Sequence, residues 1–130
     1  MTKIFLIEKD ITSASRLEAK LSLVGFKTGR PSGLQDLSLL LSEIISFQPD
    51  YIVVEPASPA FEEIGIIRVI KEEERLKDIP VFVYSGQDKK DSLWKKWEQM
   101  ADYCFSKDDM DAEAFAEKLK KISGNKKYKK

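Results

Sequence analysis

Residues Tyr51–Glu55 (YIVVE) form an uninterrupted run of strand-favouring residues that ends on one carboxylate. Pro49 precedes this run, and Pro56 and Pro59 follow it. An apolar, β-branched run without alternation is typical of a strand that is covered on both faces. Open α/β sheets keep their functional groups at the carboxyl ends of the strands, so Glu55 is the first candidate for a functional centre. The alternative is a solvated residue at the exit of a strand.

Three other short apolar runs predict strands at Lys3–Ile7, Val81–Tyr84 and Tyr103–Phe105, and Phe26–Thr28 is a short, less apolar strand candidate. Apolar residues at helical spacing predict helices between and after them, at about residues 12–24, 34–47, 62–76, 88–100 and 112–122. Strand and helix therefore alternate five times with short connections. This pattern predicts an α/β fold with a five-stranded parallel sheet, right-handed crossovers and helices on both faces. The strand order 2-1-3-4-5 of flavodoxin-like folds is common among such sheets.

Composition limits the classes of protein to which the chain can belong. Its 130 residues indicate one domain, at residues 1–123, followed by a basic tail at 124–130 that we expect to be disordered. Lys+Arg and Asp+Glu are both 22, so the balanced charge provides no general attraction to nucleic acid or acidic lipid. No apolar run is long enough to span a bilayer, and we see no signal peptide.

The cysteine and histidine content excludes several kinds of covalent, catalytic and metal chemistry. The single cysteine, Cys104, rules out an internal disulfide and fits a reduced, cytoplasmic location. The chain has no histidine, which removes His-based general base catalysis and most zinc sites.

Polar and charged side chains follow four of the predicted strands. They are Glu8, Lys9 and Asp10 after the first strand, Glu55 after the third, Ser85 after the fourth and Lys107 after the fifth. The carboxyl ends of parallel strands share one edge, so these groups are expected to lie together. Acids, a hydroxyl and a lysine at one edge have the chemistry to hold Mg²⁺ and a phosphoryl group. Two local alternatives remain open: Ser85 as a turn residue and Asp10 as a cap of the first helix.

With these features the chain resembles the receiver domain of bacterial response regulators over about residues 3–123. Residues 3–10 resemble the family's first strand and acidic cluster, and residues 49–55 resemble the strand that carries the phosphorylated aspartate. Residues 79–86 resemble the strand that ends in a phosphoryl-contacting Thr or Ser, and residues 101–107 resemble the segment that ends in the family's lysine. Pro59 and Gly65 fall where the family has a loop proline and glycine.

The chain departs from the family's pattern at the positions that matter most for phosphorylation. Glu55 stands where the family has its phosphoacceptor aspartate, and Lys9 stands where it has a Mg²⁺-binding aspartate. Asp108 replaces the usual proline after the lysine. Cys104 matches the position of the switch aromatic residue, with Tyr103 displaced by one.

These departures weaken the expected phosphate chemistry. The extra methylene of Glu55 moves its carboxylate further into the pocket, and a misplacement of about 1 Å can cost roughly 100-fold in rate. The ammonium of Lys9 removes a carboxylate and repels a cation, so Mg²⁺ binding is expected to be weak or absent, with Glu8, Asp10 and Glu55 as weak candidate ligands. Our hypothesis is that Lys9 and Lys107 replace the metal and hold Glu55 in a fixed charged arrangement.

The resemblance also implies a surface for partners. In receiver domains the fourth helix, fifth strand and fifth helix form the usual partner or dimer surface, which predicts an interaction surface that includes Trp94, Trp97, Tyr103 and Cys104. The interpretation that we favour is ordinary core packing of both tryptophans. The alternative is that one packs inward and the other is an exposed anchor for a protein partner or a second copy. Cys104 is expected to act as a small apolar strand residue.

The resulting functional prediction is a non-enzymatic, receiver-like module of two-component signal transduction that binds protein partners without phosphoryl control. One alternative is a receiver that accepts phosphate at another residue, such as Asp10 or Ser85. Another is a small hydrolase or phosphatase with Glu55 or Glu8 as base, which the absence of a nucleophile elbow and of a phosphate-binding glycine loop disfavours. A nucleotide or flavin binder is disfavoured because no Gly-rich loop follows the first strand.

Overall fold

The computed structural model describes residues 1–33, 36–55 and 65–124. Its single sheet has five parallel strands: β1 (Lys3–Ile7), β2 (Lys27–Gly29), β3 (Tyr51–Val54), β4 (Val81–Ser85) and β5 (Tyr103–Ser106). The strand order is β2-β1-β3-β4-β5, which confirms the predicted fold class and order. Each strand prediction agrees with the observed strand to within one residue.

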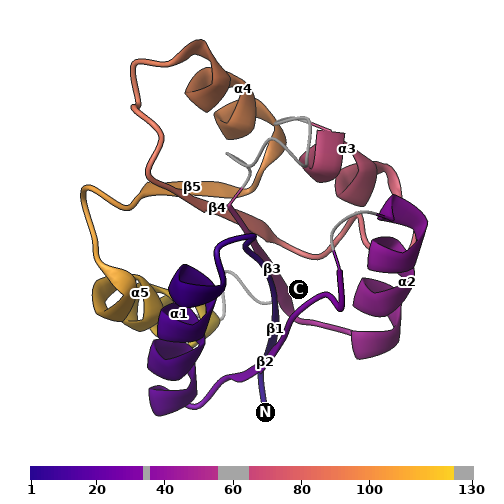
Figure 1. Cartoon of the computed structure of the whole chain (residues 1–130), viewed down its shortest axis with the longest axis horizontal. Coiled ribbons are helices and arrows are strands. Elements are labelled where there is room, and N and C mark those ends of the chain that lie inside the picture. Colours follow the sequence, from indigo (N-terminus) through magenta and orange to yellow (C-terminus); the bar gives the residue numbers. More distant parts are fainter. Residues whose placement is uncertain (34–35, 56–64, 125–130) are drawn as a thin grey trace.

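The helices of the described residues form a layer on each face of the sheet (Figure 1). They are α1 (Ile11–Leu23), α2 (Leu37–Phe47), α3 (Gly65–Glu72), α4 (Ser92–Met100) and α5 (Ala112–Gly124). Helices α1 and α5 cover one face, and α2, α3 and α4 cover the other. Successive residues of a strand point to opposite faces, so Tyr51 and Val53 enter the α1/α5 core while Ile52 and Val54 enter the α2/α3/α4 core.

Aspartate carboxylates cap four of the described helices, and the one before α5, Asp111, accepts the Ala114 N–H. The N-cap of α1 is Asp10, and its carboxylate accepts a hydrogen bond from the Thr12 N–H. Asp36 caps α2 in the same way, and Asp91 caps α4. The carboxylate of each cap satisfies a backbone N–H that the helix itself leaves without an acceptor.

The third helix is shorter at its end than the sequence predicted. It ends at Glu72, and residues 73–79 form turns in place of the predicted continuation to Leu76. The acidic run at 72–74 explains this end, because negative side chains are unfavourable at the carboxyl end of a helix. The predicted start of this helix at Glu62 lies outside the described residues, as do Pro56 and Pro59.

The last helix extends the domain by one residue, to Gly124. The remainder of the predicted tail, residues 125–130, lies outside the described residues. In the part of the chain that is described, no helix has both the length and the apolar character needed to cross a membrane.

Strand β2 packs closely against α2 where Gly29 meets the Phe47 ring, and a substitution at Gly29 tests this contact. A Cβ atom added to Gly29 would lie 2.8 Å from the Phe47 ring, so Gly29→Ala is expected to lower the free energy of unfolding by about 1 kcal/mol. The half-buried ring can shift partly, which keeps the loss small. Urea denaturation checks this, and Phe47→Leu in the Gly29→Ala background should recover part of the loss. An equal loss in the presence of Phe47→Leu would contradict the proposed clash.

Candidate functional site

Lys107 connects the ends of four strands. It directly follows β5, and its backbone N–H donates to the Ser85 carbonyl at the end of β4 over 2.8 Å. Its ammonium Nζ lies 3.3 Å from Glu8 Oε2 and 3.3 Å from Glu55 Oε2. The two carboxylates follow β1 and β3, the adjacent central strands. One lysine therefore holds two carboxylates at the carboxyl edge of the sheet.

The two carboxylates are largely shielded from water and are also held by the backbone. The Glu8 side chain is 9% exposed and the Glu55 side chain 14%. The Asp10 N–H donates to Glu8 Oε1 over 3.0 Å, and the Gly86 N–H lies 3.4 Å from Glu55 Oε2. Burial raises the pKa of Glu8 above its ordinary value, although the Asp10 N–H and the Lys107 ammonium partly oppose this.

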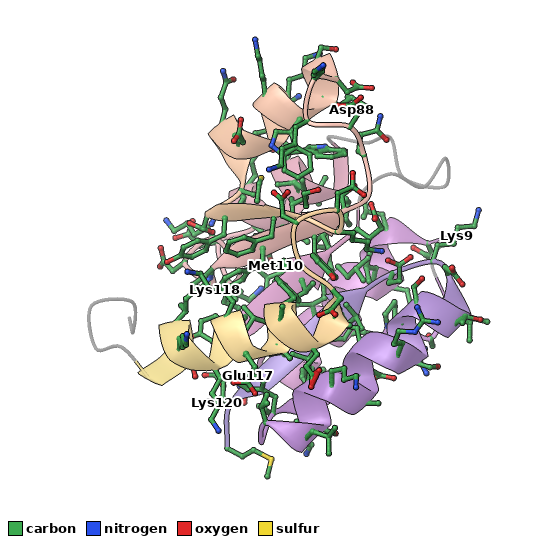
Figure 2. The ribbon with its side chains drawn as sticks, turned by 90° about the vertical axis from the view of Figure 1, so that its left-hand side faces the viewer. Lys9, Asp88, Met110, Glu117, Lys118 and Lys120 are labelled. Atoms are coloured by element: carbon green, nitrogen blue, oxygen red, sulfur yellow. The ribbon has the colours of Figure 1, made fainter. Side chains whose placement is uncertain are left out.

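Lys9 does not join this cluster. Its side chain is exposed and points away from the body of the molecule (Figure 2). The hydrogen bond from the Asp10 N–H to the Glu8 carboxylate closes a tight turn with Lys9 at its tip, which turns the lysine outward. The prediction that Lys9 helps to hold Glu55 is therefore wrong, and Lys107 alone supplies the positive charge among the described residues.

Asp10 lies beside the cluster, but its carboxylate caps α1. Oδ1 accepts from the Thr12 N–H and Oδ2 from the Ser13 hydroxyl, each over 3.0 Å. The Ser13 hydroxyl and then the Thr12 N–H lower the pKa of Asp10, because both stabilise the charged carboxylate. The helix-cap alternative for Asp10 is confirmed.

Ser85 is fully buried at the end of β4, and its hydroxyl accepts a hydrogen bond from the Gln87 N–H over 3.0 Å. The hydroxyl of Ser106, its neighbour in the sheet, likewise accepts a hydrogen bond from the Asp108 N–H over 3.1 Å. Both hydroxyls thus shape the turns that follow their strands. The turn role of Ser85 is observed, at the predicted edge of the sheet.

The charged cluster does not fit a divalent cation. No group of three or more metal-ligating side chains forms within the described ranges. The Lys107 ammonium lies between the two carboxylates, where a cation would need to bind, and Asp10 is directed to its helix. Mg²⁺ requires near-octahedral oxygen ligands, and an ammonium at this position opposes its charge.

Both tryptophans of α4 are buried, which confirms ordinary core packing and contradicts the alternative of an exposed anchor. Trp94 is 4% exposed and Trp97 0%. Positions three apart lie on the same side of a helix, which brings both rings into the core at a centroid distance of 5.7 Å. Tyr103 and Cys104 are half-buried on β5. Burial, with a smaller effect of Glu98, raises the pKa of Cys104 to about 12, which is consistent with a small apolar strand residue.

Residues that the sequence did not indicate lie on the α1/α5 side of the cluster. The Tyr84 ring lies under the Lys107 ammonium, with a distance of 5.5 Å from Nζ to the ring centroid, and its hydroxyl donates to the Met110 carbonyl over 2.7 Å. Arg16 and Asp111 line the same region. Tyr84 directly precedes Ser85 in β4. Because successive side chains of a strand point to opposite faces, this alternation was the one signal in the sequence that placed Tyr84 on the α1/α5 face.

The raised pKa of Glu8 predicts how stability depends on pH. The folded chain keeps the Glu8 proton at a pH where the unfolded chain has lost it, so stability falls as pH rises from the ordinary value of 4.5 through the folded value. Glu8→Gln removes this loss and retains an acceptor for the Asp10 N–H. At neutral pH its free energy of unfolding should equal or exceed that of the unchanged protein.

Urea denaturation at acidic and neutral pH measures this effect, with Glu117→Gln, at an exposed position in the middle of α5, as the matched control that should change little. A marked loss of stability at neutral pH in Glu8→Gln would show that the ion pair with Lys107 outweighs the cost of burial.

Comparisons with known proteins identify the fold. No family model matches the chain, and no curated protein matches it in sequence. Solved structures do match, among them a response regulator from Desulfuromonas acetoxidans, with a TM-score of 0.76, 15% identity and coverage of 95% of this chain and 98% of that one. The signal receiver domain of a histidine kinase from Syntrophus aciditrophicus matches with a TM-score of 0.76, 22% identity and coverage of 95% and 92%.

A third structure, the N-terminal domain of the nisin resistance regulator NsrR, matches with a TM-score of 0.72, 25% identity and coverage of 92% and 95%. The chain therefore has the receiver-domain fold over nearly its whole length, as the resemblance in sequence implied.

Proposed function

We propose that this chain is a receiver-like module of two-component signalling that acts by binding a protein partner, without control by phosphorylation of its charged site. The observation that carries the proposal is the position of the Lys107 ammonium, 3.3 Å from a carboxylate oxygen of both Glu8 and Glu55. This internal cation compensates the two acids permanently. A receiver that is phosphorylated needs its acceptor carboxylate and its cation site accessible at the same time.

The identity of the residue at position 55 supports the same conclusion. Its carboxylate is reached through one more methylene than that of aspartate, and its Oε2 is already engaged by Lys107 and lies near the Gly86 N–H. An in-line attack on a phosphodonor would have to break this ion pair. The alternative acceptors are also engaged, because Asp10 caps α1 and the Ser85 hydroxyl is fully buried.

The proposed surface for the partner is the face formed by α4, β5 and α5. In the described part of the sheet β5 is an edge strand, paired only with β4, and its Tyr103, Cys104 and Phe105 are half-buried. Tyr103 and Phe105 stack with Phe82, at ring-centroid distances of 4.6 and 6.4 Å. A firmly supported aromatic edge loses little conformational entropy on binding a protein or a second copy. The tryptophans support this face from within and do not serve as anchors.

Treatment with a small phosphodonor tests the proposal. After incubation with acetyl phosphate and Mg²⁺, intact mass spectrometry is expected to show no added phosphoryl group, and calorimetry is expected to show no tight Mg²⁺ binding. The double variant Lys9→Asp/Glu55→Asp restores the residue types that the family carries and is the matched control, which should gain Mg²⁺ affinity. Stoichiometric phosphorylation of the unchanged protein at Glu55, Asp10 or Ser85 would overturn the proposal.

A further inference from the structure

A cavity of about 240 Å³ lies between α1, α5 and the ends of β1 and β4. The two helices lie side by side and both begin at the carboxyl edge of the sheet (Figures 1 and 2). The cavity is lined by Glu8, Ser13, Arg16, Leu17, Tyr84, Lys107, Asp111 and Ala112. Glu8 and Lys107 of the charged cluster form part of its lining, whereas Glu55 does not.

Four polar groups of this cavity, two neutral and two charged, already have partners. The Ser13 hydroxyl donates to Asp10 Oδ2 over 3.0 Å, and the Tyr84 hydroxyl donates to the Met110 carbonyl over 2.7 Å. Glu8 and Lys107 are paired with each other. These four groups form a wall whose hydrogen bonds are largely satisfied within the protein.

The remaining two charges differ from the others. Arg16 on α1 is exposed at the rim, and it forms no ion pair within the ranges that the structure describes. Asp111 uses Oδ1 to accept the Ala114 N–H over 2.9 Å at the start of α5, and no ion pair of its carboxylate occurs among the same residues. A guanidinium and a carboxylate thus face one cavity from two helices without neutralising each other.

We propose that this cavity binds a free α-amino acid. Arg16 would bind the α-carboxylate through its planar pair of N–H donors, and Asp111 would accept hydrogen bonds from the α-ammonium. Leu17, Tyr84 and Ala112 supply an apolar wall for the side chain. Small-molecule sites typically combine an apolar lining with a few polar groups that fix orientation.

The charge balance favours a zwitterion over a ligand with one charge. The four charged side chains of the lining are two acids and two bases, and their charges sum to zero. A simple anion would meet Arg16 but would be repelled by Glu8 and Asp111. A simple amine would meet Asp111 but would be repelled by Arg16 and Lys107. Only a ligand with both charges gains from both unpaired groups.

The experiment is a titration of the isotopically labelled chain, followed through backbone amide signals, with the proteinogenic amino acids added one at a time. At least one amino acid is expected to shift the signals of residues 13–17 and 107–112 in a saturable manner. Its decarboxylated amine and its deaminated acid should each bind at least about tenfold more weakly, because each lacks one of the two charges. Absence of saturable shifts with every amino acid would overturn the proposal, as would equal binding of either analogue.

Two variants test the assigned roles. Arg16→Gln and Asp111→Asn should each weaken binding about tenfold or more, and the asparagine oxygen still accepts the Ala114 N–H, so α5 keeps its cap. The matched controls are Lys20→Gln, which removes a cation from the same helix outside the cavity, and Glu113→Gln, which removes an acid from α5. Unchanged affinity in Arg16→Gln or Asp111→Asn, or equal losses in the controls, would contradict the proposed site.

Binding of an amino acid in this cavity does not depend on the proposed signalling function. Phosphorylation of the protein would overturn that function without affecting amino-acid binding, and a failure to bind amino acids would leave the phosphodonor result as it stands.

Discussion

Replacement of Trp97 by alanine is expected to lower the free energy of unfolding by about 3–5 kcal/mol. Trp97 is the largest fully buried side chain in the core between the sheet and α2, α3 and α4. Its removal leaves a cavity between α4 and the sheet that the surrounding β4 and α3 side chains cannot fill. Because small domains have a total stability of about 5–15 kcal/mol, this single change removes a large share of it.

Urea denaturation followed by circular dichroism measures the loss. Lys96→Ala, at the exposed neighbouring position on the same helix, is the matched control and should change stability by less than about 0.5 kcal/mol. Trp97→Phe should lie between the two. A loss below about 1 kcal/mol in Trp97→Ala would show that α4 is not held by this contact.

The second large effect is expected for Lys107→Met at neutral pH, where the free energy of unfolding should fall by about 2–3 kcal/mol. Without the ammonium, the Glu8 and Glu55 carboxylates are left next to each other with little exposure to water. The side chain of Lys107 is itself 30% exposed, so the loss should be smaller than for a fully buried ion pair.

The loss should depend on pH with a defined sign. Removal of the cation raises the pKa of Glu8 further, so the folded variant takes up a proton that the unfolded chain releases. The deficit should therefore shrink as pH falls and grow as pH rises towards neutrality. Denaturation at several pH values checks this trend.

The triple variant Glu8→Gln/Glu55→Gln/Lys107→Met is the control, because it lacks all three charges and should lose the added pH dependence. A deficit of equal size at acidic and neutral pH in Lys107→Met would indicate lost packing of the lysine stem over Tyr84 and not lost charge compensation.

The receiver-like fold is stabilised in two different ways, by burial in the core and by charge compensation at the edge of the sheet. The core around Trp97 stabilises by burial, which does not depend on pH. The cluster at Lys107 stabilises by charge compensation at the edge of the sheet, where receiver domains are expected to place a cation and a phosphoryl group. If the Lys107→Met result follows the predicted pH trend, the lysine acts as a permanent structural counter-ion, as the proposed function requires.

Much of the fold could be predicted from local sequence. Buried parallel strands require continuous apolar runs, and Lys3–Ile7 and Tyr51–Val54 are such runs. Helix faces follow from the spacing of apolar residues, and the caps Asp10 and Asp91 carry side chains that suit the role. The grouping of Glu8, Glu55 and Lys107 at one edge of the sheet could also be predicted from the sequence, because the carboxyl ends of parallel strands meet at that edge.

The directions of individual side chains were decided by the tertiary structure. Lys9 and Lys107 are both lysines next to strand ends, yet the turn closed by Glu8 directs the first outward while the second reaches back over the sheet. Both tryptophans of α4 are buried because α3 and the sheet leave an apolar space large enough for two rings.

The cavity between α1 and α5 likewise exists only in three dimensions, since Arg16 and Asp111 are far apart in the sequence and come together only when both helices pack on the same face. The periodicity of the chain determined which residues are buried and in which element, because that depends on neighbours a few positions away. The partner of each charge was decided by packing between distant segments, because electrostatic contacts act over a few ångströms of space and not along the chain.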